Sequence, residues 1–162
     1  MPHTDTMPLT DRADPPLFNA SPLEASTANR AYSLIRLFES KLDRRHWSAF
    51  VRRQQRSGGA GGVMMLSDAR GAAHAVFAWR VRHNLVGEKV LDITDAVLGS
   101  LPGRALADAL VDSIMELASR IGCPLIEVEL PDAVAGPRRD LLLARGFRRV
   151  GYDRLLARIG PS

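Results

Sequence analysis

The sequence lacks the features of disulfide-bonded, membrane-spanning and metal-binding proteins. Its single cysteine, Cys123, excludes an intramolecular disulfide, so nothing indicates an oxidising compartment and we expect a cytoplasmic protein. No apolar run approaches the roughly 20 residues that a membrane-spanning helix needs. His46 and His74 show no metal-ligand spacing with each other or with Cys123, so we expect no structural or catalytic metal.

Lysine and aromatic residues are also scarce. Twenty of the 22 basic residues are Arg, a bias that reflects an Arg-rich, bacterial type of genome as much as any binding partner. Arg clusters could meet phosphate groups, but aromatic residues make up only 6% of the chain and no zinc-finger, RRM or helix-turn-helix pattern is present. We therefore expect no nucleic-acid partner, and a basic RNA-associated domain is an alternative that rests on the Arg clusters alone.

Length and hydrophobic content predict one small domain. The chain has 162 residues, 46% of them hydrophobic, which is enough for a single core. Residues 1–27 are rich in Pro, Thr, Asp and Ser, carry no secretion-signal pattern, and are predicted to form a flexible arm that precedes a domain at 28–162. Within the arm, residues 15–19 could add a first strand at a sheet edge.

The first half of that domain reads as two helices, a hairpin and a strand. Apolar spacing predicts a helix at residues 28–39, and Asp43 is placed to cap a second helix that presents Trp47 and Phe50. The glycine-rich residues 57–62 lack the Lys-Ser/Thr of a phosphate loop and are interpreted as a linker. Strands are predicted at 63–67 and 75–83 around a turn, followed by a strand at 90–97.

The second half is the more informative. Leu106, Leu110, Ile114, Leu117 and Ile121 lie on one helical face, and Gly122 and Pro124 end that helix. At the start of this helix, Pro and Gly precede the first exposed backbone N–H groups. These groups form a candidate anion-binding site. A strand at 125–130, a short helix at 137–145 capped by Gly146, and a final strand at 147–159 with a bulge near 151–153 complete the prediction.

This order of elements resembles the GNAT superfamily of acyl-CoA-dependent N-acyltransferases. The resemblance rests on residues 97–152, in which a strand leads to a glycine turn and a helix, and a later Gly146-Phe147 closes the pattern. It implies an α/β fold of the α+β type, with a mixed, mainly antiparallel sheet flanked by helices. It also implies that residues 28–55 wall an acceptor pocket. The six positions of the family's CoA-binding loop, which would hold the pyrophosphate, fall on Pro102, Gly103, Arg104, Ala105, Leu106 and Ala107.

The sequence departs from the family pattern at several positions. Pro102 replaces the family's Arg or Gln, Ala105 replaces its first Gly, and Leu142 stands where the family carries a Tyr that protonates the departing thiolate. No Asn or Tyr lies between Pro124 and Gly151, so the family's Asn is missing as well. Arg104, Arg138 or Arg139 could supply the missing positive charge beside the phosphates.

Candidate catalytic residues are acidic. An acceptor amine must lose a proton before it attacks a thioester, and a carboxylate can relay that proton through water. Asp92 and Asp95 lie closest in sequence to the loop, and a regular strand would send them to opposite faces, so only one could face the acceptor. Glu127, with Glu129, is the next choice of base, and a strand N–H near Val97 or Leu98 would polarise the carbonyl.

The predicted activity is transfer of an acyl group from acyl-CoA to a small-molecule or peptide amine. Acetyl is the acyl group that we expect first. The protein could form a homodimer, as the resemblance implies. The alternative from another functional class is a non-catalytic GNAT-like module that binds CoA, a metabolite or a protein partner, because fold alone does not ensure activity.

Overall fold

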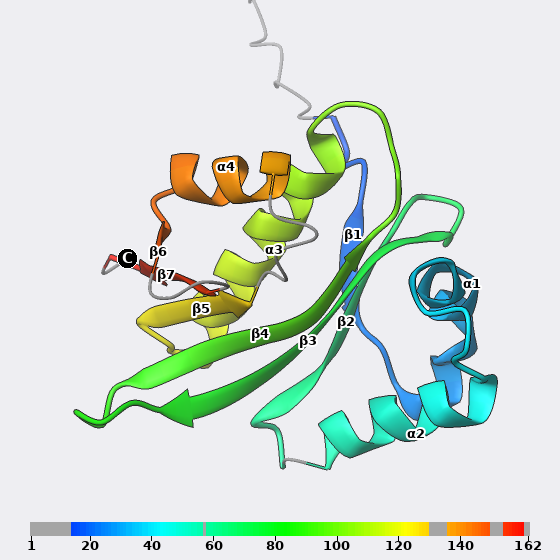
Figure 1. The fold of residues 1–162 in the computed structure, drawn as a ribbon, viewed down its shortest axis with the longest axis horizontal. Helices are drawn as coiled ribbons and strands as arrows, with labels where there is room; N and C mark the ends of the chain where they lie inside the picture. Colours follow the sequence, from blue (N-terminus) through cyan, green and yellow to red (C-terminus); the bar gives the residue numbers. More distant parts are fainter. Residues whose placement is uncertain (1–13, 57, 130–135, 150–153, 161–162) are drawn as a thin grey trace, which may run out of the picture.

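The computed structural model describes residues 14–56, 58–129, 136–149 and 154–160. They form a seven-stranded sheet in the order β1-β2-β3-β4-β5-β7-β6. The neighbours β4 and β5 are parallel, and every other neighbouring pair is antiparallel. Figure 1 shows α3 and α4 on one side of this sheet and α1 and α2 on the other. The predicted mixed, mainly antiparallel α+β architecture is confirmed.

The elements follow one another in the predicted order. The strands are β1 (Asn19–Pro22), β2 (Gly61–Ser67), β3 (Ala73–His83), β4 (Lys89–Leu98), β5 (Leu125–Glu129), β6 (Arg148–Arg149) and β7 (Arg154–Arg158). The helices are a short 3-10 turn η1 (Ala25–Thr27), α1 (Asn29–Phe38), α2 (Arg44–Gln55), α3 (Ala105–Ile121) and α4 (Gly136–Ala144).

A side-chain hydrogen bond fixes the start of α2, and a left-handed glycine fixes the end of α3. The Asp43 side chain accepts a hydrogen bond of 2.8 Å from the backbone N–H of His46, which satisfies one of the unpaired donors at the start of α2. At the far end of α3, Gly122 has φ 78°, a left-handed conformation that residues with a Cβ adopt at a cost. Both predicted caps are therefore confirmed.

Each face of the sheet has its own core. Phe77, Leu91 and Ile93 pack beneath α3 and α4, together with Ile126 and Val128 of β5. On the other face, α1 and α2 pack against Val63, Met65, Val76 and Ala78. The alternation of side chains along β2 and β3 supplies both cores at once, which is why these strands have apolar residues in consecutive positions.

Two predicted strands differ from the structure. The edge strand occupies Asn19–Pro22 rather than residues 15–19, and it pairs with β2 from Asn19 opposite Ser67 to Pro22 opposite Met64. The next residue, Leu23, is buried, so this end of the expected arm is packed against the domain.

The C-terminal segment forms two antiparallel strands, β6 and β7, in place of the single strand predicted for 147–159. Apolar alternation does not reveal a reversal of the chain, because both arms of a hairpin share the same period. The predicted bulge near 151–153 falls outside the described residues.

The remaining observations concern membrane-spanning helices and the burial of the single cysteine. In the part of the chain that the structure describes, no helix is both long enough and apolar enough to cross a bilayer. Cys123 is buried just after α3, where burial raises the pKa of its thiol. A raised pKa keeps the thiol protonated and unreactive, in agreement with a packing role.

Candidate active site at the bulge of strand β4

Strand β4 leaves its parallel neighbour halfway along its length. Its pairing with β5 runs from Val90 opposite Leu125 to Ile93 opposite Val128 and extends no further among the described residues. The pairing with β3 continues to Leu98, which lies opposite Ala75. The second half of β4 therefore presents, on its β5 side, a backbone edge that no described strand covers, and such an edge can hydrogen-bond an extended ligand.

The same half of β4 contains a β-bulge at Asp95. Val76 of β3 pairs with Val97, whereas Ala78 pairs with Thr94, so β4 carries one residue more than β3 over this interval. Asp95 takes φ 50°, the one positive φ among the non-glycine residues that the structure describes. Aspartate tolerates this left-handed conformation better than most residues, yet it remains uncommon and clusters at functional sites.

The bulge changes which face each residue of β4 occupies. Leu91 and Ile93 pack into the core under α3, and the next residues of β4 in that core are Ala96 and Leu98. The spacing of three between Ile93 and Ala96 shows where the two-residue alternation is broken. Our expectation that Asp92 and Asp95 lie on opposite faces assumed a regular strand, and the bulge removes that assumption.

Asp95 is exposed and lines a cavity of about 450 Å³ on the α1 and α2 side of the sheet. The helices and β4 contribute most of its wall, through Ile35, Glu39, Trp47, Phe50, Arg53, Asp95, Ala96 and Val97. The first two helices therefore wall a cavity, and its use by an acceptor stays a prediction. The sequence prediction missed Glu39 as a site residue, because an acidic residue at a helix end carries no signal that it faces a cavity.

A second hollow, of about 240 Å³, lies where β4 gives way to α3. It is lined by Leu98, Gly99, Ser100, Leu101, Gly103, Leu106 and Ala107. The predicted residues Leu98, Gly103, Leu106 and Ala107 thus meet at one hollow. Pro102, Arg104 and Ala105 belong to the same turn but not to its lining, and Val97 lines the neighbouring cavity instead.

The start of α3 is suited to an anion. Arg104 is the N-cap residue and its side chain makes no capping hydrogen bond to the first N–H groups of the helix, although Asp108 places one carboxylate in the first turn. Gly103 has φ 79° and turns the chain into the helix. Arg104 lies 4.0 Å from Asp108 and is mostly exposed, so its guanidinium can still reach a phosphate. The side chain of Arg138 lies outside the described residues.

The other two predicted carboxylates lie elsewhere. Asp92 is 1% exposed, and its Oδ2 accepts a hydrogen bond of 2.9 Å from Arg80 and lies 3.8 Å from Arg82 Nε. Glu127, opposite Asp92 on β5, forms an ion pair with Arg82. The structure therefore separates the three candidates, since Asp92 and Glu127 belong to an ion-pair network and neither lines the cavity that Asp95 faces.

Leu142 is buried in the core beneath α4. The position of the family's tyrosine is therefore filled by an apolar residue that packs rather than one that could donate a proton. Among the described residues, no cluster of three or more His, Cys, Asp or Glu side chains is arranged to hold a metal ion.

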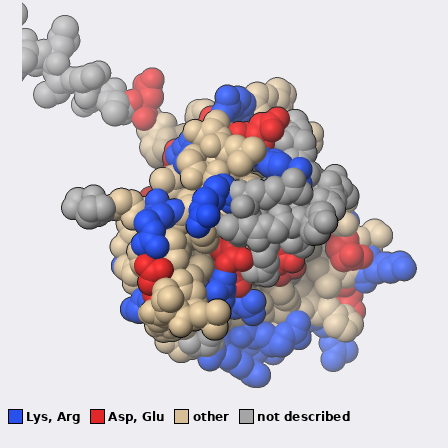
Figure 2. Space-filling model, turned by 60° about the vertical axis from the view of Figure 1, so that its left-hand side comes forward, with Lys and Arg blue, Asp and Glu red and all other residues tan. Residues whose placement is uncertain are grey.

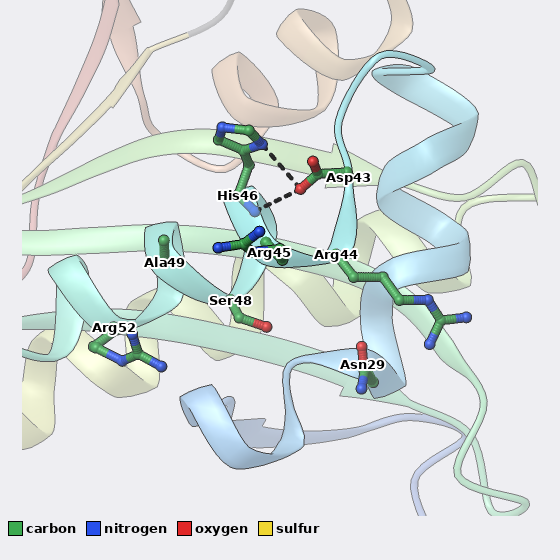
Figure 3. Close-up of a pocket in the computed structure, with 8 residues that line it drawn as sticks. All are labelled: Asn29, Asp43, Arg44, Arg45, His46, Ser48, Ala49 and Arg52. Atoms are coloured by element: carbon green, nitrogen blue, oxygen red, sulfur yellow. Dashed lines mark hydrogen bonds and ion pairs between the residues drawn. The ribbon is translucent and has the colours of Figure 1, made fainter.

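A further hollow, of about 710 Å³, lies on the exposed side of α2 (Figure 3). Its basic lining comes from Arg44, Arg45 and Arg52, and Asn29 at the start of α1 lies beside them. Elsewhere on the surface, Figure 2 shows Lys and Arg side chains gathered along the lower edge of one face and acidic side chains dispersed over it. The hollow shares no residue with β4, and His46 is the lining residue that it has in common with the cavity at the bulge.

The fold has close structural counterparts. An acetyltransferase from Trypanosoma brucei matches with a TM-score of 0.64 and 18% identity, covering 84% of this chain and 96% of that one. A ribosomal-protein-alanine N-acetyltransferase from Brucella melitensis matches with a TM-score of 0.67 and 12% identity, covering 88% and 99%. The chain has the GNAT fold. An aminoglycoside N-acetyltransferase in complex with CoA also matches this GNAT-fold chain, with a TM-score of 0.69, 12% identity, and coverage of 83% and 90%.

The sequence of this GNAT-fold chain is much less similar than its structure. No protein-family model matches it, and no curated protein matches it either. At identities of 12% to 18%, the solved structures establish the arrangement of helices and strands alone. The activity depends on the side chains and cavities of this chain.

Proposed function

We propose that this protein transfers an acyl group, by preference acetyl, from acyl-CoA to the amine of a small molecule or peptide. One observation carries the proposal: consecutive residues, at the end of strand β4 and in the loop that follows it, line two neighbouring hollows. Asp95, Ala96 and Val97 line the cavity beneath α1 and α2, and the next residues, from Leu98 to Leu101, line the hollow at the start of α3. Direct transfer requires this arrangement, because both substrates must reach the same point at once.

Acyl-CoA would occupy the hollow at the start of α3. The first N–H groups of that helix, which the N-cap side chain does not bond, favour a pyrophosphate, and Arg104 can add a positive charge. The uncovered edge of β4 beyond Ile93 can hydrogen-bond the amide groups of the pantetheine arm. A backbone N–H near Val97 or Leu98 would then polarise the thioester carbonyl, as an oxyanion hole does.

Asp95 is the proposed general base. The acceptor enters the cavity as an ammonium ion and passes one proton to the Asp95 carboxylate, directly or through a water molecule. The nitrogen lone pair attacks the thioester carbonyl carbon, the C–N bond forms and the C–S bond breaks. The nitrogen, positively charged after the attack, releases its second proton to solvent, and the departing CoA thiolate takes up a proton from solvent. A thiol whose pKa is about 8.5 leaves without a positioned acid more readily than an alcohol does, so the absence of the family's tyrosine slows the reaction without preventing it.

Calorimetric titration with acetyl-CoA tests the cofactor part of the proposal. Gly103 is a poor place to introduce a charge, because its positive φ would strain any other residue. Ser100 lines the hollow and is exposed, so Ser100→Glu places a carboxylate beside the expected phosphates. Ser33→Glu, on the exposed side of α1, is the matched control. We expect binding by the wild type and by Ser33→Glu, and loss of binding in Ser100→Glu.

Two further results would separate the enzyme from its alternative. Asp95→Asn keeps a side chain that tolerates the left-handed conformation but removes the base, and it should lower turnover by about 100-fold or more. If Asp95→Asn turns over like the wild type, Asp95 is not the base. If the wild type does not bind acetyl-CoA, the non-catalytic module becomes the better account of this fold.

A further inference from the structure

The cavity that Asp95 lines has an aromatic wall held in a fixed position. Trp47 of α2 is 3% exposed, and its indole N–H donates a hydrogen bond of 2.7 Å to the backbone oxygen of Ala28. The ring of Phe50 stacks on that of Trp47, with centroids 5.7 Å apart and planes 15° from parallel. Phe50 is half-buried and lines the cavity, so it presents an apolar surface whose orientation is set before a ligand enters.

The charges at this cavity are mainly negative. Asp95 and Glu39 contribute two exposed carboxylates, against one guanidinium from Arg53. His46, at the same cavity, lies 2.9 Å from the Asp43 carboxylate, so its ring is held at the start of α2. An ammonium ion would be attracted by the two carboxylates, whereas a phosphate or carboxylate would meet two like charges against the one positive charge of Arg53.

The size of the cavity favours a small molecule. Its volume of about 450 Å³ lies in the lower half of the usual range for small-molecule sites, roughly 300 to 1,000 Å³. Most of the wall is apolar, from Ile35, Leu42 and Val76 as well as the two aromatic rings. Such a wall gains affinity by covering a flat apolar body, and it offers few partners to a strongly hydrated sugar or polyamine.

We propose that the acceptor is a small primary amine carried on an aromatic or similarly flat apolar body, as in an arylalkylamine. This inference rests on the proposed acyl transfer and names its substrate class. The ring packs against Phe50, and the ammonium group lies at Asp95, beside the strand residues that adjoin the CoA hollow. The transfer converts the ammonium and the thioester into an amide, a free thiol and one released proton.

Direct binding of acceptor analogues tests this inference without requiring turnover. Phenethylamine would be titrated calorimetrically into the wild-type protein, and 3-phenylpropionate, which has a similar body and the opposite charge, would serve as the matched ligand. Spermidine supplies positive charge without a ring. We expect phenethylamine to bind at least about tenfold more tightly than either, a difference of roughly 1.4 kcal/mol.

Variants assign that binding to the cavity. Asp95→Asn should lower the affinity for phenethylamine by up to about fivefold, the range expected for the loss of one partly solvated charge pair. Phe50→Leu should lower the affinity for phenethylamine more than the affinity for hexylamine, because the substitution removes ring stacking and keeps an apolar side chain. Glu116→Gln removes an exposed carboxylate from α3, which does not border this cavity, and should leave both affinities unchanged.

The outcomes distinguish this inference from the proposed function. If acetyl-CoA binds and the protein acetylates spermidine or an amino sugar in preference to phenethylamine, the acceptor class is wrong and acyl transfer stands. If 3-phenylpropionate binds as tightly as phenethylamine, the inference is overturned whatever acetyl-CoA does. If acetyl-CoA fails to bind, the proposed function falls, while the amine titration still decides what the cavity accepts.

Discussion

Replacing Asp95 by Ala and by Gly should reverse the usual order of stability for these two residues in a strand. In a regular strand, Gly is less stable than Ala by about 0.5 to 1 kcal/mol because it loses more backbone entropy on folding. At φ 50°, however, a residue with a Cβ bears a cost of about 1 to 2 kcal/mol that Gly avoids. The left-handed cost exceeds the entropy loss, so Asp95→Gly should be the more stable variant by about 0.5 to 1 kcal/mol.

Thr94 provides the matched control, since it precedes the bulge on the same strand and pairs regularly with Ala78. At this position Thr94→Ala should be more stable than Thr94→Gly by about 0.5 to 1 kcal/mol. The two pairs of variants therefore differ in sign. For a chain of this length, each kcal/mol corresponds to a shift in thermal midpoint of about 2 to 4 °C.

Thermal unfolding followed by far-UV circular dichroism measures both pairs. Asp95→Gly should unfold about 1 to 4 °C above Asp95→Ala, and Thr94→Gly about 1 to 4 °C below Thr94→Ala. Neither Asp95 variant has a carboxylate, so the order of stability is read independently of activity. If Asp95→Ala is as stable as Asp95→Gly or more so, residue 95 is not held in a left-handed bulge and the geometry of the site must be revised.

Three other predictions concern positions away from the bulge. Leu142→Tyr, which restores the residue that the family carries there, should lower the free energy of unfolding by about 1 to 3 kcal/mol because Leu142 fills a packed core, and a thermal midpoint equal to that of the wild type would contradict this. The hydrogen bond from His74 lowers the pKa of the Asp68 carboxyl from its ordinary value of 3.8, so its contribution to stability is complete above that value and is lost as the pH falls through the lower folded pKa. Accordingly, the difference in thermal midpoint between the wild type and Asp68→Asn should be constant at neutral pH and shrink in acid; a difference that grows below pH 3.8 would reverse the sign of this linkage. Burial raises the pKa of the Cys123 thiol, so a thiol reagent should label the native protein slowly and the unfolded protein fast; equal rates would place Cys123 at the surface.

Much of the fold is predictable because the relevant signals are local. The apolar face of α3 and its glycine cap depend on residues within one helix, and the N-cap Asp43 acts three residues from its partner. The hairpin of β2 and β3 follows from two alternating segments around a turn. The division of the C-terminal segment into β6 and β7 was missed because both strands have the same period of alternation.

The candidate site is only partly predictable. Sequence proximity placed the loop residues at one hollow, since Leu98, Gly103, Leu106 and Ala107 are close along the chain. It could not rank the carboxylates, because Asp92 and Asp95 have similar sequence surroundings and differ in what lies across the sheet. Arg80 and Arg82, on the neighbouring strand, engage Asp92, and the bulge leaves Asp95 exposed at the cavity.

The sequence by itself determined the order of elements from α1 to α4, the start of α2, the end of α3 and the position of the loop before α3, because each depends on interactions between residues close along the chain. Tertiary structure alone decided the bulge at Asp95, the ion pairs of Asp92 and the cavity between α2 and β4. These features arise where segments distant in sequence pack together, as when Phe50 of α2 and Asp95 of β4 come to line one cavity. The spacing of residues within a single segment does not predict such contacts.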